Sequence, residues 1–199
     1  MNIWVVCTAA PVTPPPKRCT GAEFEAAMTA LTEGAVQPYT GKPLQSAGRP
    51  LYAAPGHAAR QTAESFYPDA EIQVEPLLSP TPERTFRDGE QSRPLWLWKA
   101  MARSQRNAGN ARQPESRKQT EQRLDTLIDR LQEQGKDCIL VADAELVTLL
   151  MDRLRLRGCT FARCFTPTIL PRRIRWGRCG TIWPSAARSI PTATPCCAR

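Results

Sequence analysis

Cys7 and Thr8 are the first residues of the chain whose side chains could act as nucleophiles, and they follow the apolar run NIWVV at 2–6. A cysteine thiolate is nucleophilic by itself, whereas a threonine hydroxyl needs a base beside it. Asp143 stands after another apolar run, and His57, the only histidine, opens a stretch rich in helix formers. The chemistry that such side chains could carry is nucleophilic attack on a substrate, with a base beside the nucleophile.

Cys7 lacks the neighbours that a cysteine-based phosphatase needs. Such a site requires an arginine six residues beyond the cysteine, with backbone amides between the two. Here Thr13 stands at the arginine position, and Pro11 removes one of the amides. The sequence therefore favours Cys7 as a small apolar residue of the core.

The elements that must position these residues alternate along the chain. Short apolar runs predict buried strands, and runs of helix formers or apolar residues spaced i, i+3, i+4 and i+7 predict helices. Strands are expected at 2–6, 51–54, 71–78, 137–144 and 170–176, and helices at 21–34, 57–66, 93–105, 118–135 and 144–158. The alternation predicts an α/β fold, a three-layer α/β/α sandwich with a mostly parallel sheet.

Two stretches are predicted to be loops, because 12–21 is interrupted by prolines and 81–94 is polar and rich in turn formers. Trp96 and Trp98 lie on different faces of the helix expected at 93–105. We interpret them as packing residues rather than as a platform for stacking bases. In α/β sheets, ligands bind beyond the carboxyl ends of the strands, so the strand ends near Thr8, Ala54 and Asp143 are the expected site.

The positive charge of the chain is concentrated in its last quarter. Residues 1–152 hold 17 Lys and Arg against 19 Asp and Glu, whereas residues 153–199 hold ten Arg and no acidic residue. The end of the chain mixes Arg, Cys, Pro, Thr and Trp without a period of 2 or 3.6. We interpret 177–199 as an irregular tail, either disordered or the product of a frameshift, and not as a nucleic-acid-binding arm.

The cysteines favour neither a metal site nor a disulfide framework. Five of the eight lie beyond residue 158, no CxxC pair occurs, and a single histidine is present. The N-terminal apolar run is too short for a signal peptide or a membrane span and has no basic residues before it. The sequence thus predicts a soluble cytoplasmic protein with no metal, no cofactor and no membrane partner, whose ligand would be a small molecule.

Three strand ends, taken in order, resemble the histidine phosphatase superfamily, also called phosphoglycerate-mutase-like. The segment LYAAPGHAARQTAE matches the family pattern YxSPxxRAxQTAE without a gap, at Tyr52, Pro55, Ala59 and the run QTAE at 61–64. The segment ILVADAELVTLLMDRL is similar to the family's strand, Ser-His-Gly motif and apolar helix. LPRRIRW resembles a late family segment that forms the last strand. The resemblance covers 1–176, which is the predicted domain.

The resemblance implies a known mechanism. In the family, a histidine after the first strand attacks the phosphoryl group, two arginines and a second histidine hold its oxygens, and a carboxylic acid protonates the leaving oxygen. The chemistry requires a nucleophile that is neutral at pH 7, cations that neutralise a dianion, and a proton donor.

This sequence departs from the family at each of these positions. Cys7 stands for the first arginine and Thr8 for the nucleophilic histidine, Ala58 stands for the second arginine, and Asp143 stands for the second histidine. The acid is expected near Ser79, which leaves Glu83 as a displaced candidate. Because cations are lost and Asp143 adds a negative charge, we expect a cationic or neutral ligand rather than a phosphoester.

Neighbouring residues offer limited replacements. Arg60 lies about 200° round its helix from Ala58 and so points away from the pocket, whereas His57 lies about 100° round and reaches the rim at most. Thr8 with Asp143 as its base is the alternative catalytic pair, but Asp143 also stands where a helix N-cap is expected. The ligand-binding candidates are Thr8, His57 and Asp143.

We therefore predict a histidine-phosphatase-like protein that has lost catalysis and acts, if at all, by binding a ligand or partner. The alternative is a divergent phosphomonoesterase that uses Thr8 and Asp143 with His57. A third reading is a non-functional gene product, of which the irregular tail would be the sign.

Overall fold

The computed structural model describes residues 1–161 and 172–176, and side chains up to Cys159. A six-stranded sheet in the order β4-β3-β6-β1-β8-β7 forms its centre. The strands β4, β3, β6 and β1 are parallel, and β8 runs antiparallel to both β1 and β7. The sheet strands are β1 (Asn2–Cys7), β3 (Leu51–Ala53), β4 (Ile72–Val74), β6 (Cys138–Ala142), β7 (Cys159–Phe161) and β8 (Arg172–Trp176).

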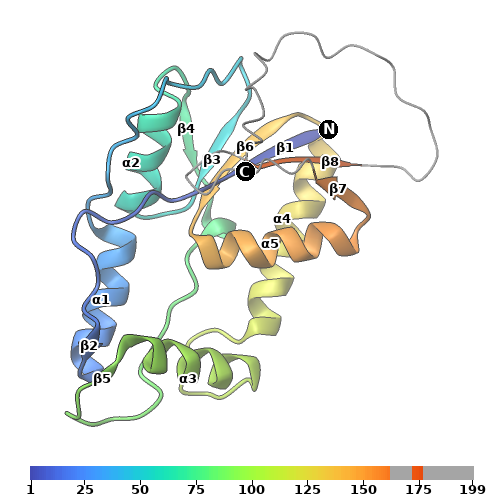
Figure 1. Cartoon of the computed structure of the whole chain (residues 1–199). Helices are drawn as coiled ribbons and strands as arrows, with labels where there is room; N and C mark the ends of the chain where they lie inside the picture. The colour runs from blue at the N-terminus through green and yellow to red at the C-terminus, as the bar shows by residue number, and fades with distance from the viewer. Residues whose placement is uncertain (162–171, 177–199) are drawn as a thin grey trace, which may run out of the picture.

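Helices lie on both faces of this sheet, so the predicted α/β class with its three layers is confirmed. The chain moves from β1 to β3 and β4 through α1 (Gly21–Glu33) and α2 (His57–Phe66). It returns toward β6 and β7 through α4 (Arg117–Gln134) and α5 (Ala144–Leu156). Crossover connections between parallel strands are right-handed. Because the chain crosses the sheet in opposite directions through these two pairs of helices, the pairs lie on opposite faces of the sheet. Figure 1 shows α1 and α2 together on one side and α4 and α5 on the other.

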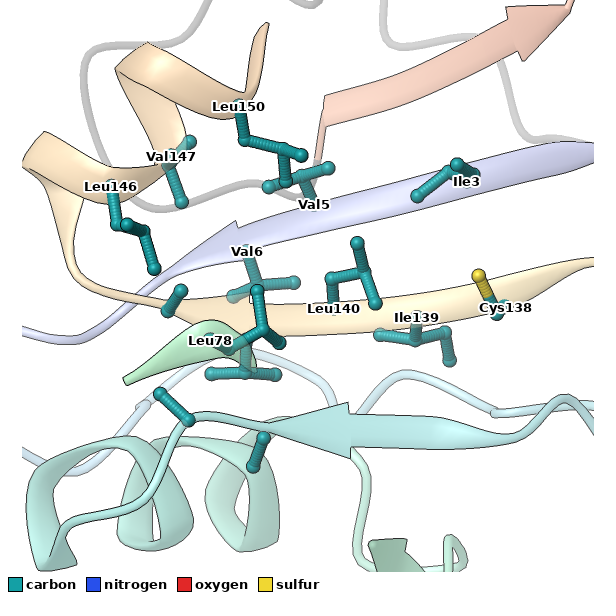
Figure 2. Packing of buried hydrophobic residues seen from close by; sticks show 14 of the residues in the cluster. Ile3, Val5, Val6, Leu78, Cys138, Ile139, Leu140, Leu146, Val147 and Leu150 are labelled. Carbon is teal, nitrogen blue, oxygen red and sulfur yellow. The ribbon is translucent and has the colours of Figure 1, made fainter. Parts of the chain in front are cut away.

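The core follows from the apolar runs that predicted the strands. All five residues of β6 are buried, as expected for a parallel strand covered on both faces. In Figure 2, Leu150 of α5 points toward Val5 of β1. On α4 the periodic residues Leu124, Leu127, Ile128 and Leu131 are all buried. The helix ends where the sequence predicted, at Gly135, which adopts a left-handed conformation with φ of 63°.

A second, smaller core lies apart from the sheet, where α3 (Leu95–Asn107) packs on α1 (Figure 1). Trp98 is buried in it, stacks on Phe24, and donates its indole N–H to the carbonyl of Cys19 at 2.9 Å. Trp96 is 68% exposed. Trp98 is thus a packing residue as predicted, whereas Trp96 faces solvent and packs little.

The prediction of loops at 12–21 and 81–94 was wrong at two points. The short strands β2 (Arg18–Cys19) and β5 (Arg93–Pro94) form a two-stranded antiparallel ribbon. Neither dipeptide has strand character of its own, and the pairing accompanies the packing of α3 on α1. The third predicted strand ends earlier than expected, because Pro76–Leu78 forms a 3-10 helix.

Of the predictions for the end of the chain, one is confirmed and the others are not tested by the described residues. The last predicted strand is present as β8. The tail at 177–199 lies outside the described residues, and the boundary at 176 stays a prediction. Within the described part of the chain, no helix is long and apolar enough to span a membrane.

Candidate functional site

The carboxyl ends of β1, β3 and β6 meet at one edge of the sheet, as the strand order requires. The amide of Thr8 donates to the carbonyl of Ala142 at 2.9 Å, and the amide of Ala54 donates to the carbonyl of Val141 at 2.8 Å. A cavity of about 550 Å³ opens directly beyond these ends. Four of the predicted site residues line it: Thr8, Ala58, Glu83 and Asp143.

The floor of this cavity is held by the helix that carries the QTAE run. The hydroxyl of Thr62 accepts from the amide of Ala9 at 3.0 Å and donates to the carbonyl of Ala58 at 2.7 Å. The side-chain carbonyl of Gln61 accepts from the amide of Val36 at 2.9 Å. The polar residues of the QTAE run therefore fix the loops around the pocket, which is a structural task that needs no catalytic arginine.

Ala58 occupies the position that the resemblance assigns to the second arginine. It is 2% exposed and packs with Ala9 and Val36 in a small apolar cluster. Thr8, at the position of the nucleophile, is half-buried. The floor thus offers one hydroxyl and small apolar groups where the family presents cations and an imidazole.

Asp143 caps α5 and also faces the cavity. Its Oδ1 accepts from the amides of Glu145 and Leu146, each at 2.9 Å, which is the N-cap geometry that the sequence predicted. Its Oδ2 is buried and accepts no hydrogen bond. Burial raises the pKa of the Asp143 carboxyl, and the two amide donors only partly offset this effect.

Glu83 lines the same cavity, with a side chain that is only 8% exposed. Burial first, and then the negative charge of Glu145, raises the pKa of the Glu83 carboxyl. The guanidinium of Arg106 lies 3.7 Å from Glu83, too far for a hydrogen bond, and bonds to Glu145 with its other terminal nitrogen. Burial also acts on Glu145, but Arg106 and Arg103 outweigh it and hold the pKa of that carboxyl below its ordinary value.

Two predicted residues lie outside the lining of the cavity. His57 is exposed at the start of α2, and its amide donates to Glu33 at 3.3 Å. Cys7 is exposed, so the prediction of a core cysteine was wrong. Cys7 is the last residue of β1, and burial on this strand ends at Val6, the residue before it. Arg60 is exposed and bonds to Glu64 at 3.1 Å, away from the pocket as expected.

The sequence reasoning missed the charged residues of α3. Lys99 and Arg103 line the cavity, and Arg106 lies behind them. The signal was present, because these three residues are spaced i, i+4 and i+7 and so share one helix face. Glu145, in the first turn of α5, was missed as well. Among the described residues, no group of three His, Cys, Asp or Glu side chains is arranged to hold a metal ion.

No protein-family model and no curated protein matches the chain. Solved structures similar to it include a protein assigned as an alpha-ribazole-5′-P phosphatase from Escherichia coli. The two chains are 18% identical, the match covers 79% of this chain and 80% of that chain, and the TM-score is 0.44. The alpha-ribazole phosphatase of Shigella flexneri has 19% identity, the same two coverages and a TM-score of 0.42. A phosphoserine phosphatase from Entamoeba histolytica, in complex with 3-phosphoglyceric acid, has 11% identity, coverages of 78% and 80%, and a TM-score of 0.44.

These proteins are histidine phosphatase superfamily members. The α/β fold of this chain is similar to theirs. Since the TM-scores are below 0.5 and the identities below 25%, the similarities say nothing about the activity of this chain, which has to be judged from its own residues.

Proposed function

We propose that this chain is a histidine-phosphatase-like protein that binds a small-molecule ligand and does not catalyse phosphoryl transfer. One observation carries the proposal: the cavity floor, at the strand ends, is made of Thr8, Ala58 and Asp143. None of these side chains is a cation, and the Thr8 hydroxyl is not a nucleophile at neutral pH without a base beside it. A phosphoryl dianion placed there would meet a carboxyl group instead of the charges that stabilise its transfer.

The geometry around Thr8 supports the proposal. Activation of its hydroxyl requires a base within hydrogen-bond reach. Asp143 uses Oδ1 to cap α5, and its Oδ2 accepts no hydrogen bond. Thr8 therefore has no hydrogen bond to this carboxylate among the described residues.

The test is phosphate-ester hydrolysis by the purified full-length chain, with 4-nitrophenyl phosphate as the probe. A variant that combines Cys7→Arg, Thr8→His, Ala58→Arg and Asp143→His restores the family residues and serves as the comparison. We expect no turnover by the native chain. Hydrolysis by the native chain that disappears in Thr8→Ala would contradict the proposal, and circular dichroism would establish that each variant is folded.

A divergent phosphomonoesterase is the second candidate, and one observation favours it. Glu83 and Asp143 both line the cavity with Thr8, and burial raises the pKa of each carboxyl, which is the direction that a proton donor requires. If this candidate is correct, Thr8→Ser retains turnover while Thr8→Ala and Asp143→Asn lose it. Equal turnover in all three variants would point to a contaminating phosphatase.

A further inference from the structure

A second cavity, of about 270 Å³, adjoins the one at the strand ends. The two share four lining residues, Thr81, Arg103, Glu145 and Thr148, so they form one continuous groove with Arg103 at the junction. Three arginines line the smaller cavity: Arg103 and Arg106 from α3, and Arg117 from the start of α4. The cations that the strand ends lack are thus present a short way along the groove.

Each of these arginines has donor groups to spare. A guanidinium carries five N–H donors. Arg103 uses Nη2 on Glu145 at 3.2 Å, and Arg117 uses Nε on Glu121 at 2.8 Å. Arg103 and Arg117 are about half exposed, with side-chain values of 54% and 50%, so an entering ligand meets them first.

Arg106 forms the inner wall of the smaller cavity. Its side chain is only 9% exposed, and its Nη1 is buried without a hydrogen-bond acceptor. A carboxylate oxygen of Glu83 lies 3.7 Å from this nitrogen, beyond hydrogen-bond distance. A buried charged donor without an acceptor is costly, and an oxyanion is the kind of group that would satisfy it.

The two carboxylates that line the smaller cavity are each bonded to arginine. Glu145 accepts from both Arg103 and Arg106, and Asp152 accepts from Arg155 at 3.2 Å. Arg117 and Thr120 belong to the first turn of α4, so the positive end of the helix dipole adds to the field there. Three arginines therefore face two carboxylates in the lining of this cavity, which leaves an excess of positive charge.

The larger cavity continues the groove with a different character. Away from Asp143 and Glu83, much of its wall is apolar, with Pro11, Met28 and Leu31 on one side. An aliphatic or aromatic body would bury apolar surface there.

We propose that the groove takes an organic anion, with its phosphate-like or carboxylate head group at Arg103, Arg106 and Arg117 and its uncharged body against Pro11, Met28 and Leu31. This inference rests on the proposed function, because it takes the groove to hold a ligand without transferring its phosphoryl group. It replaces the cationic or neutral ligand expected from Asp143 alone, since the arginines of α3 and α4 were not part of that expectation.

The test is isothermal titration of the full-length chain with three probes that share one hexyl chain: hexylphosphonate, heptanoate and hexylammonium. Hexylphosphonate has no ester bond to hydrolyse, so its binding is measured whether or not the protein proves to be a phosphatase. Binding of both acids indicates a general oxyanion site, and binding of the phosphonate alone indicates a site for phosphate-like groups. We expect hexylammonium not to bind.

The matched variants are Arg103→Gln with Arg117→Gln, and Arg60→Gln as the control. The first two remove half-exposed donors and leave the buried Arg106 in place, so the fold is retained. We expect the double variant to weaken hexylphosphonate binding by about tenfold or more, and Arg60→Gln, at an exposed site on α2, to leave it unchanged. No binding of either acid up to about 10 mM, tighter binding of hexylammonium, or an unchanged double variant would overturn the proposal.

Discussion

The floor and the wall of the groove are built in different ways. The floor consists of strand ends that are locked by backbone hydrogen bonds, such as that from Thr8 to Ala142, and its side chains are small or neutral apart from Asp143. The wall is the charged face of α3, which is held by a small core of its own around Trp98. A scaffold can thus keep its strand ends in register while the charges that face the ligand come from a separately packed helix.

The largest effect in this comparison is expected from Trp98→Ala, which removes the anchor of the wall. Trp98 is 1% exposed, stacks on Phe24, packs at a tilt against Phe86, and donates a buried hydrogen bond to Cys19. We expect a loss of about 4 kcal/mol in the free energy of unfolding, measured by urea denaturation. Trp96→Ala, on the exposed side of the same helix, should change it by less than about 0.5 kcal/mol. Similar losses in both variants would mean that α3 is not anchored through Trp98.

A smaller loss is expected from Arg106→Met, which removes a charge from the wall and keeps much of its volume. Glu83 and Glu145 then lose a buried cation, and breaking a buried ion pair costs about 3 kcal/mol. Adding Glu83→Gln removes one of the uncompensated carboxylates. The double variant should therefore be more stable than Arg106→Met alone in the same denaturation experiment. A double variant that is less stable would show that Glu83 does not depend on Arg106.

Much of the fold could be predicted because its signals are local. The apolar run of β6, the periodic leucines of α4 and the cap at Asp143 each depend on residues within a few positions of one another. The strand ends near Thr8, Ala54 and Asp143 were located correctly for the same reason, since the order of elements fixes where parallel strands finish.

The failures concern contacts between distant segments. Cys7 is exposed at the end of β1 whereas Val6 before it is buried, and nothing in the residues near Cys7 marks where that burial ends. The spacing of Lys99, Arg103 and Arg106 predicts that they share one side of a helix. The cavity that this side lines depends on contacts between distant residues, such as the hydrogen bond from Trp98 to Cys19, 79 residues apart. Residue type and local spacing therefore predicted which residues share a face, and not which cavity that face lines.

The smallest effect is expected on the floor, from Asp143→Asn, and it depends on pH. Burial raises the pKa of the Asp143 carboxyl in the folded protein above its unfolded value of about 3.9. The folded state thus binds the Asp143 proton more tightly than the unfolded state does. The stability that this proton provides is fully present below about pH 3.9 and is lost as the pH rises through the pKa of the folded state. Asparagine caps a helix about as well as aspartate and does not titrate.

The melting temperature of Asp143→Asn relative to the native chain should therefore rise between pH 4 and pH 8, by about 2–4 °C for each kcal/mol of stability. Asp88→Asn is the matched control, because Asp88 is exposed and its pKa is lowered by its hydrogen bond to Arg112. For Asp88→Asn, the melting temperature relative to the native chain should fall over the same pH range or stay unchanged. If the difference in melting temperature between Asp143→Asn and the native chain stays constant with pH, the Asp143 carboxyl ionises in the folded protein at no cost in stability. The floor would then stabilise a charge as well as the wall does.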